Sequence, residues 1–225
     1  MNIGRMHGES EAYRQARDAL LEAEIALRDQ REAVAAQRRK LPRDTAIDDY
    51  VFHEGPADLD LDGPVSEVCL SDLLGDSGKP LIVYQYMYGA AQNAPCSSCT
   101  MWVDGLNGAS QHIDRNVNFA VVAQTEIGPL RSLGQRRGWR GLRLLSSAGS
   151  TFKTDLNFQD EAGRQFPGVS VFGRAPDGSP CHFYSASALM RADQFRGIDL
   201  LSPVWNLLDL TPKGRGDWEP SLAYD

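Results

Sequence analysis

The amino-acid sequence predicts an α/β fold with a central mixed sheet flanked by helices, preceded by a long N-terminal helix. Two strongly apolar segments, 80–89 and 117–124, are rich in β-branched and aromatic residues, as buried strands are. The stretch between them repeats apolar residues at helical spacing, which completes a βαβ unit with parallel strands and a right-handed connection. Further on, "GVSVFG" and "CHFYSA" flank "RAPDGSP", whose proline, aspartate and glycine are typical of a hairpin.

Residues 9–41 are expected to form the N-terminal helix, which makes residues 1–42 a helical arm. Apolar residues recur there every seven positions, at Tyr13, Leu20, Leu27, Val34 and Leu41. The second series of such a repeat starts with alanines but continues with Gln30 and Gln37, so the apolar face is narrow. We therefore expect this helix to lie on the main domain or on a second copy of the chain, as a homodimer contact. Pro42 ends it, because the residue before a proline is pushed out of the helical region.

The rest of the chain is expected to comprise three parts. Residues 43–79 are a loop-rich lead-in with a short helix or turn around a buried Cys69. Residues 80–210 carry the main domain, in which 127–138 is a helix, "GLRLLSS" is a strand, and 192–210 is a last helix that Pro203 splits. Residues 211–225 form a polar and loosely held tail.

Length and charge narrow the classes of function. A chain of 225 residues suits one sizeable domain with appendages. Its net charge of -7 argues against nucleic acid as the main partner, because phosphate binding needs a basic surface. No run approaches the ~18 apolar residues of a membrane span, and the N-terminus has no apolar core of a secretion signal. We therefore expect a cytoplasmic protein with no membrane partner.

One local basic cluster stands out against this acidic background. It consists of the arginines at 131, 136, 137, 140 and 143. A solvated helix and loop face is the favoured interpretation, and a patch that binds an anionic ligand or partner is the alternative.

The sequence "NAPCSSCTMW" at 93–102 carries the clearest chemical motif, a Cys-x-x-Cys pair between the first strand and the first helix of the βαβ unit. Cytosolic thiols are kept reduced, so such a pair is more often catalytic than structural. If the helix begins at Cys96, the free N–H groups and the positive end of the helix dipole favour its thiolate. Cys96 would then attack a disulfide, and Cys99, one turn inward, would resolve the mixed disulfide.

Metal binding is the main rival interpretation of the pair. A structural zinc needs four ligands, and Cys181-His182 is the only obvious complement to the two cysteines. Adjacent residues on a strand point to opposite faces, so both could not ligate without distortion. We expect neither a metal nor another cofactor. His112 lies too far along the helix to act as a base for Cys96 and is assigned a helix C-terminal charge role.

Several longer motifs resemble one known family. They are "LLEAEIALRDQREAVAAQRRKLP", "PCSSCTMWVDGLNG", "RRGWRGLRLLSS", "FPGVSVFG", "FYSASA" and "LLDLTPKGRGD". Together, over roughly residues 15–217, they resemble an uncharacterised bacterial thioredoxin-like family of predicted dithiol-disulfide oxidoreductases. The resemblance implies a thioredoxin fold and a redox-active disulfide. It also implies that Pro167 is a cis-proline that opens the strand facing the cysteines and leaves backbone groups free to bind an extended substrate.

The chain departs from the better-known members of this fold at several positions. Ser97-Ser98 replaces the Gly-Pro found between thioredoxin cysteines, and the strand before the pair holds no carboxylate to lie beneath it. Peroxiredoxins place Thr three positions and Pro seven positions before the reactive cysteine, where this chain has Asn93 and Gly89. Trp102, one turn beyond Cys99, is expected to pack in the core or to form a lid over the site.

Three functions follow as hypotheses. The first is a thiol-disulfide oxidoreductase in which Cys96 is the nucleophile, Cys99 resolves, and the substrate is a protein or small-molecule disulfide. The second is a thioredoxin-like binding or dimerisation protein whose cysteines are structural. The third is a thiol peroxidase that uses Cys96.

Overall fold

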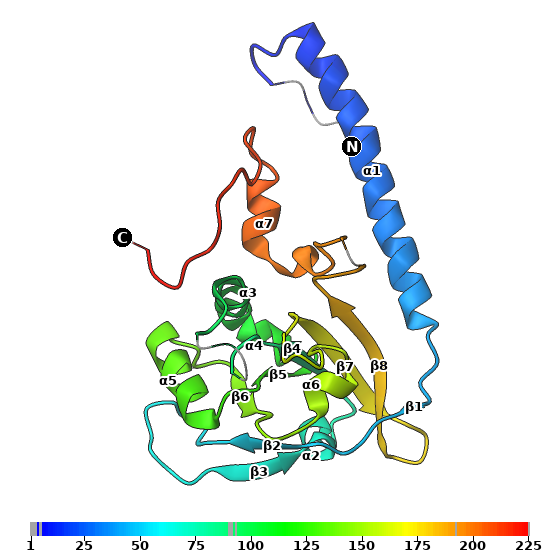
Figure 1. Cartoon of the computed structure of the whole chain (residues 1–225). Helices are drawn as coiled ribbons and strands as arrows, with labels where there is room; N and C mark the ends of the chain where they lie inside the picture. The colour runs from blue at the N-terminus through cyan, green and yellow to red at the C-terminus, as the bar shows by residue number, and fades with distance from the viewer. Residues whose placement is uncertain (1–3, 5, 90–91, 93, 192, 225) are drawn as a thin grey trace. The chain divides into compact units, whose positions relative to one another are not determined.

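The structure of this chain, a computed structural model, describes residue 4 and residues 6–89, 92, 94–191 and 193–224 (Figure 1). It contains two compact units, Met1–Pro42 and Arg43–Asp225, which are described separately below.

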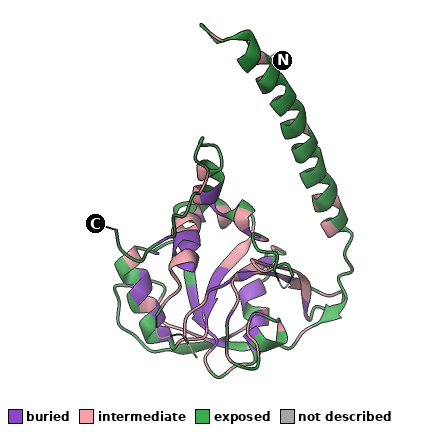
Figure 2. Ribbon diagram, turned by 45° about the horizontal axis from the view of Figure 1, so that its top comes forward, coloured by how far each residue is buried: buried purple, intermediate pink, exposed green. Residues whose placement is uncertain are grey.

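The first unit is dominated by a single long helix, α1 (Glu11–Arg39). Its start is capped by Ser10, whose hydroxyl accepts a hydrogen bond from the N–H of Tyr13 at 3.1 Å. No residue of α1 is buried, and Figure 2 shows the helix almost entirely in the colour of exposed residues. The seven-residue apolar series therefore lies open, with Leu20 52% and Leu27 62% exposed. In the described part of the chain, no helix is both long and apolar enough to cross a membrane.

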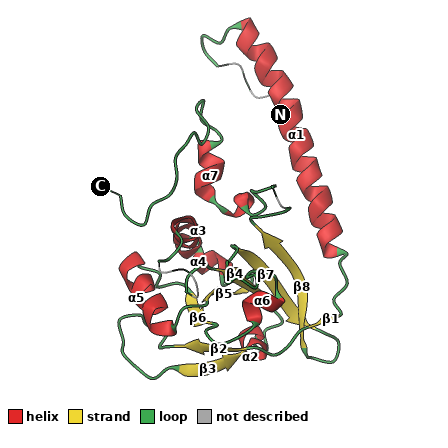
Figure 3. Ribbon diagram, viewed as in Figure 1, coloured by secondary structure: helices red, strands yellow, loops and turns green. Residues whose placement is uncertain are grey.

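The second unit is built on one eight-stranded sheet, drawn in yellow in Figure 3. Its strands are β1 (Thr45–Ala46), β2 (Val51–Glu54), β3 (Ser66–Cys69), β4 (Leu81–Gln85), β5 (Asn118–Ala123), β6 (Arg143–Ser146), β7 (Gly168–Arg174) and β8 (Pro180–Ser187). Their order across the sheet is β1-β8-β7-β4-β5-β6-β2-β3. The pairs β4–β5 and β5–β6 are parallel, whereas β7 runs antiparallel to both β4 and β8. The predicted mixed α/β sheet is confirmed.

The helices of this unit follow the expected order. They are α2 (Leu70–Leu74), α3 (Ser97–Gly108), α4 (Ser110–Ile113), α5 (Ile127–Arg137), α6 (Phe152–Asp155), the 3-10 turn η1 (Asp199–Leu201) and α7 (Pro203–Leu208). Gly138 ends α5 in the left-handed conformation, at φ 71°, as the sequence suggested. Pro203 does split the last helical stretch, because it occupies the first position of α7 and follows η1.

The segment 43–79 differs from the expected loop-rich lead-in, because it supplies three strands and a helix. β2 and β3 extend one edge of the sheet beyond β6, and β1 pairs with β8 at the other edge. Each of these strands has at most four residues and at most one fully buried side chain, such as Phe52 or Val68. A pattern that short shows no readable periodicity. Cys69, expected to be buried, is only partly covered at the start of α2.

The sheet separates two hydrophobic cores, because side chains alternate between the faces of each strand. Tyr84 and Tyr86 face the core that α3 and α5 cover. Leu81 and Val83 face the other core, which includes Phe152 at the start of α6. The C-terminal end of β4 thus lies between α3 on one face and α6 on the other.

The C-terminal tail is held in place, which corrects the expectation of a loose segment. The Trp218 ring packs edge-on against Trp205 of α7 at 5.5 Å between centroids. The Arg215 guanidinium bonds Asp209 at 2.9 and 2.7 Å and Asp199 at 2.6 Å. The aromatic and charged residues of this tail follow no periodic pattern in the sequence, so the sequence did not predict their specific partners.

Candidate functional site

Cys96 lies where the loop after β4 meets α3. It is the N-cap residue of that helix, with extended backbone angles of φ -67° and ψ 125°. Its N–H donates to the Met87 carbonyl at 3.1 Å, which fixes the loop against the end of β4. Its Sγ accepts a hydrogen bond from the Cys99 N–H at 3.3 Å. The sulfur therefore occupies the position where a helix start stabilises negative charge.

This environment lowers the pKa of the Cys96 thiol to about 7. The largest cause is the hydrogen bond from the Cys99 side chain, and the backbone N–H groups of Cys99 and Ser98 act in the same direction. Partial burial opposes them. Because an ordinary cysteine titrates near 8.5, the thiolate fraction at neutral pH is raised well above the few per cent of a free thiol.

Cys99 has the opposite character. It is fully buried on the inner side of α3, and burial raises the pKa of its thiol well above the ordinary value. The buried Tyr84 hydroxyl lies close enough to this thiol to favour its thiolate, but it makes no hydrogen bond of regular geometry. One thiol of the pair is thus partly exposed and easily ionised, while the other is enclosed and ionises less readily.

The helix start that carries the pair is anchored by Thr100. Its hydroxyl donates to the Cys96 carbonyl at 2.8 Å and is also bonded to the Tyr86 hydroxyl at 2.6 Å. Gly89, in the loop between β4 and α3, has φ 95°, and a side chain there would meet Thr125 N at 2.3 Å. Proline, which fixes φ near -65°, cannot occupy this position, so the peroxiredoxin pattern is excluded at Gly89 on backbone grounds. Asn93 lies outside the described residues.

A buried lysine completes the surroundings of the pair, and no sequence pattern indicates it. Lys153 of α6 is fully buried, and its Nζ donates to the Tyr86 carbonyl at 2.7 Å. Burial lowers the pKa of Lys153 to about 7, and the nearby Cys99 thiolate acts in the opposite direction. Among the described residues it is the only Lys, Arg, Asp or Glu that is buried as a whole residue. The four-residue α6 is too short for periodicity to place, so nothing in "STFKTD" signals burial.

Pro167 lies directly before β7, beside the C-terminal end of β4, but without the geometry that the resemblance implies. No peptide bond among the described residues is cis, so the bond from Phe166 to Pro167 is trans. The Pro167 carbonyl accepts a hydrogen bond from the Ala188 N–H at 2.9 Å. The hairpin partner β8 thus uses the carbonyl that a substrate would otherwise bind.

Trp102 is a core residue rather than a lid. Its side chain is only 6% exposed and packs edge-on against Trp205 of α7, with ring centroids 6.5 Å apart. The packing interpretation is therefore the right one of the two alternatives.

The remaining cysteines and histidines do not assemble around the pair. Cys181 is buried on β8, and the neighbouring His182 bonds Ser185 Oγ through Nε2 at 2.8 Å. Across the residues that the structure places, no group of three or more His, Cys, Asp or Glu side chains is arranged to hold a metal ion. The four cysteines are free thiols.

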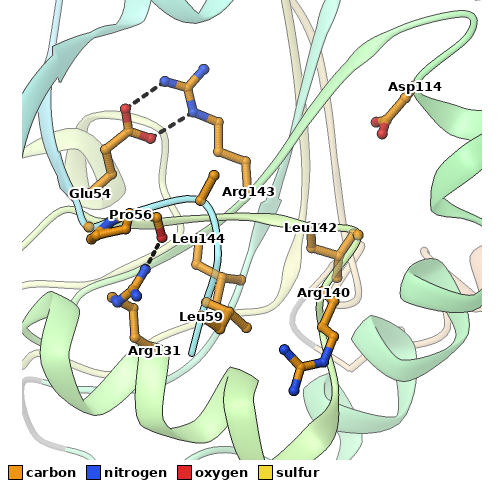
Figure 4. Close-up of a pocket in the computed structure, with 12 residues that line it drawn as sticks. Glu54, Pro56, Leu59, Asp114, Arg131, Arg140, Leu142, Arg143 and Leu144 are labelled. Carbon is orange, nitrogen blue, oxygen red and sulfur yellow. Dashed lines mark hydrogen bonds and ion pairs between the residues drawn. The ribbon is translucent and has the colours of Figure 1, made fainter. Parts of the chain in front are cut away.

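Three arginines of the cluster, Arg131, Arg140 and Arg143, line a cavity of about 420 Å³ between β6, α5 and the loop after β2 (Figure 4). Arg143 pairs with Glu54 through two bonds of 2.7 and 2.8 Å. Arg131 donates to three carbonyls of the loop 56–61, and Arg140 pairs with Asp60. These three guanidinium groups already have partners from the chain, which favours a structural role over an anionic ligand.

The fold and the site together define a thioredoxin-like α/β protein with a 29-residue N-terminal helix. The structure of reduced Prx3 in complex with H2O2 from Vibrio vulnificus is similar at a TM-score of 0.50 and 10% identity, over 72% of this chain and 94% of that one. Enterococcus faecalis AhpC gives a TM-score of 0.48 at 15% identity, over 72% of this chain and 87% of that one. At such identities the likeness is one of fold.

The chain belongs to the family described as "Bacterial protein of unknown function (DUF899)", whose model matches residues 4–223. The resemblance to an uncharacterised bacterial thioredoxin-like family is therefore confirmed. Comparison with curated proteins found no similar sequence.

Proposed function

We propose that this protein is a thiol-disulfide oxidoreductase in which Cys96 is the nucleophile and Cys99 the resolving cysteine. The observation that carries the proposal is the asymmetry of the pair. Cys96 is partly exposed at the start of α3 with a lowered pKa, whereas Cys99 is buried one turn inward with a raised pKa. Only an exposed thiolate can meet a disulfide substrate, and only a neighbouring thiol can release it afterwards.

The proposed reaction has two exchanges. The Cys96 thiolate attacks one sulfur of the substrate disulfide, which forms a mixed disulfide and releases the other sulfur as a thiolate. Cys99 then loses its proton and attacks Cys96 Sγ, which releases the second substrate thiol and leaves the Cys96–Cys99 disulfide. The protein loses two electrons and the substrate gains them. The reverse sequence oxidises a dithiol. We place this activity in the cytoplasm, where reductants keep thiols available.

The test is to trap the mixed disulfide. Cys99→Ser should accumulate a covalent adduct with a model disulfide substrate, because the resolving step is lost. Cys96→Ser should form no adduct and should lose nearly all turnover. Cys69→Ser is a matched control, since Cys69 is also partly exposed but burial raises its pKa. Turnover by Cys96→Ser at the level of the unaltered chain would rule out the proposal.

Hydrogen peroxide is the second substrate to test, because the similar structure of reduced Prx3 from Vibrio vulnificus is a complex with H2O2. The Cys96 thiolate would attack one peroxide oxygen to give a sulfenic acid and hydroxide. Cys99 would then displace water and form the same disulfide. A peroxide-consumption assay on the variants above separates the two activities, and consumption that survives in Cys96→Ser would exclude a peroxidase role for this site.

A second proposal concerns α1, whose exposed apolar series offers a surface for a second copy of the chain. Apolar residues that recur every seven positions lie on one side of a helix, where a second helix can pack. We propose that the chain forms a homodimer through this stripe.

A further inference from the structure

The Tyr86–Met87 peptide group stands between Lys153 and Cys99. Lys153 reaches from α6, on one face of the sheet, and its Nζ donates to the Tyr86 carbonyl at 2.7 Å. The N–H of Met87 belongs to the same peptide group and lies close enough to the Cys99 sulfur to favour its thiolate. In a trans peptide the C=O and N–H point in opposite directions. The amine and the thiol therefore flank one peptide dipole from opposite sides.

Both groups are fully buried, so charges on them interact strongly. Lys153 and Cys99 are each 0% exposed. Away from water, an isolated ammonium or thiolate is strongly disfavoured, and an opposite charge nearby offsets that cost. One peptide group and two polar contacts separate the amine from the sulfur, which allows the charges to interact without direct proton transfer.

The other ionisable groups around Lys153 cannot take this role. Tyr84 of β4 and Tyr86, the residue directly after β4's last residue, are buried phenols whose pKa is raised, so both remain neutral. Asp155, on α6 itself, accepts bonds from Tyr50 at 2.8 Å and Thr151 at 2.5 Å on the exposed side. The Cys96–Cys99 pair of α3 supplies the remaining ionisable groups.

We propose that Lys153 is the buried charge partner of the resolving cysteine: its amine is held protonated when the reduced pair carries a thiolate and loses that proton when the Cys96–Cys99 disulfide forms. The inference rests on the proposed function for its redox half. Oxidation of a thiolate–thiol pair removes two electrons and the one remaining thiol proton, and the proton released by Lys153 leaves with it to solvent. Lys153 is a positioning residue in this scheme, because it acts on the substrate only through Cys99.

The direct test is an NMR titration of the lysine side chains in the full-length protein. The chain has only four lysines, and Lys40, Lys79 and Lys213 are not buried, so they serve as internal references. In the reduced protein, Lys153 should titrate below the other three. Oxidation to the disulfide should lower its midpoint further, by about half a pH unit or more. Titration together with the other lysines, or identical midpoints in both redox states, would overturn the proposal.

A variant separates this inference from the proposed function. Cys99→Ser in the reduced state removes the partner sulfur without any redox step, and it should also lower the Lys153 midpoint. If no reversible disulfide forms at all, the proposed function fails, and this comparison alone decides whether Lys153 and Cys99 are coupled. An unchanged midpoint in Cys99→Ser would contradict the coupling.

The converse measurement is the reduction potential of the pair at pH 7. A positive Lys153 stabilises the thiolate of the reduced form, so Lys153→Met should make the pair more reducing, with up to about a tenfold change in the equilibrium with glutathione, or about 30 mV. Lys79→Met is the matched control, because Lys79 precedes β4 at the opposite end of that strand and bonds the Asp114 carbonyl. Equal reduction potentials in a folded Lys153→Met variant and in the unaltered chain would contradict the proposal. If that variant does not fold, the NMR titration decides the question.

Discussion

Cys96 and Cys99 are three residues apart and differ in almost every physical respect. Cys96 is a helix N-cap with a hydrogen-bonded sulfur, and Cys99 is a core residue in contact with buried tyrosines. The sequence could predict this difference, because a helix that begins at the first cysteine necessarily turns the second one inward. The sequence could not predict that Lys153 is buried beside the pair, because the burial of one lysine depends on which layer of the fold covers it.

The lowered pKa of Cys96 gives the first prediction at this scale. The rate of iodoacetamide alkylation at Cys96, followed by mass spectrometry between pH 5 and 9, should rise through an inflection near pH 7, because the thiolate is the nucleophile. Cys99 should remain unmodified in the folded protein, since it is buried. An inflection near the ordinary value of about 8.5 would instead favour a binding protein with structural cysteines.

Among the elements, those with long continuous patterns were predicted and the short ones were not. The apolar runs of β4 and β5 and the spacing in α3 and α5 carry enough residues to show a period. The strands of 43–79 and helix α6 have two to four residues each, and only their partners in the sheet and core specify them. The sequence could not predict the trans bond before Pro167 either, because the path of the backbone into β7 determines whether that bond is cis or trans.

Helix α1 gives a prediction at the scale of an element. The double variant Leu20→Lys, Leu27→Lys places two charges on the exposed apolar stripe and should convert a dimer to a monomer, as measured by light scattering across a range of concentrations. The variant Gln15→Lys, Glu22→Gln makes the same net charge change on the opposite side of the helix, which a period of 3.6 residues places about half a turn away. It should leave the mass unchanged. A monomeric unaltered chain, or equal masses for all three proteins, would contradict a dimer through α1.

At the scale of the whole molecule, the sheet brings four separate segments to the end of β4. The segment directly after β4 supplies the peptide group between the two layers, the start of α3 supplies the thiols from one face, α6 supplies the amine from the other, and β7 begins beside them. The parallel β4–α3–β5 arrangement makes this end of the sheet the natural place for a site, because strand ends and a helix start meet there. The proposed function depends on this convergence rather than on the Cys-x-x-Cys motif alone.

The most direct test of the central claim is a redox titration of the unaltered full-length protein in glutathione buffers, with thiols trapped by alkylation and the modified residues mapped by mass spectrometry. The account predicts one reversible two-electron transition in which Cys96 and Cys99 lose their labels together and form a disulfide, while Cys69 and Cys181 remain thiols that label once the protein is unfolded. Independent labelling of Cys96 and Cys99 across the whole range of potentials, with no disulfide between them, would contradict it.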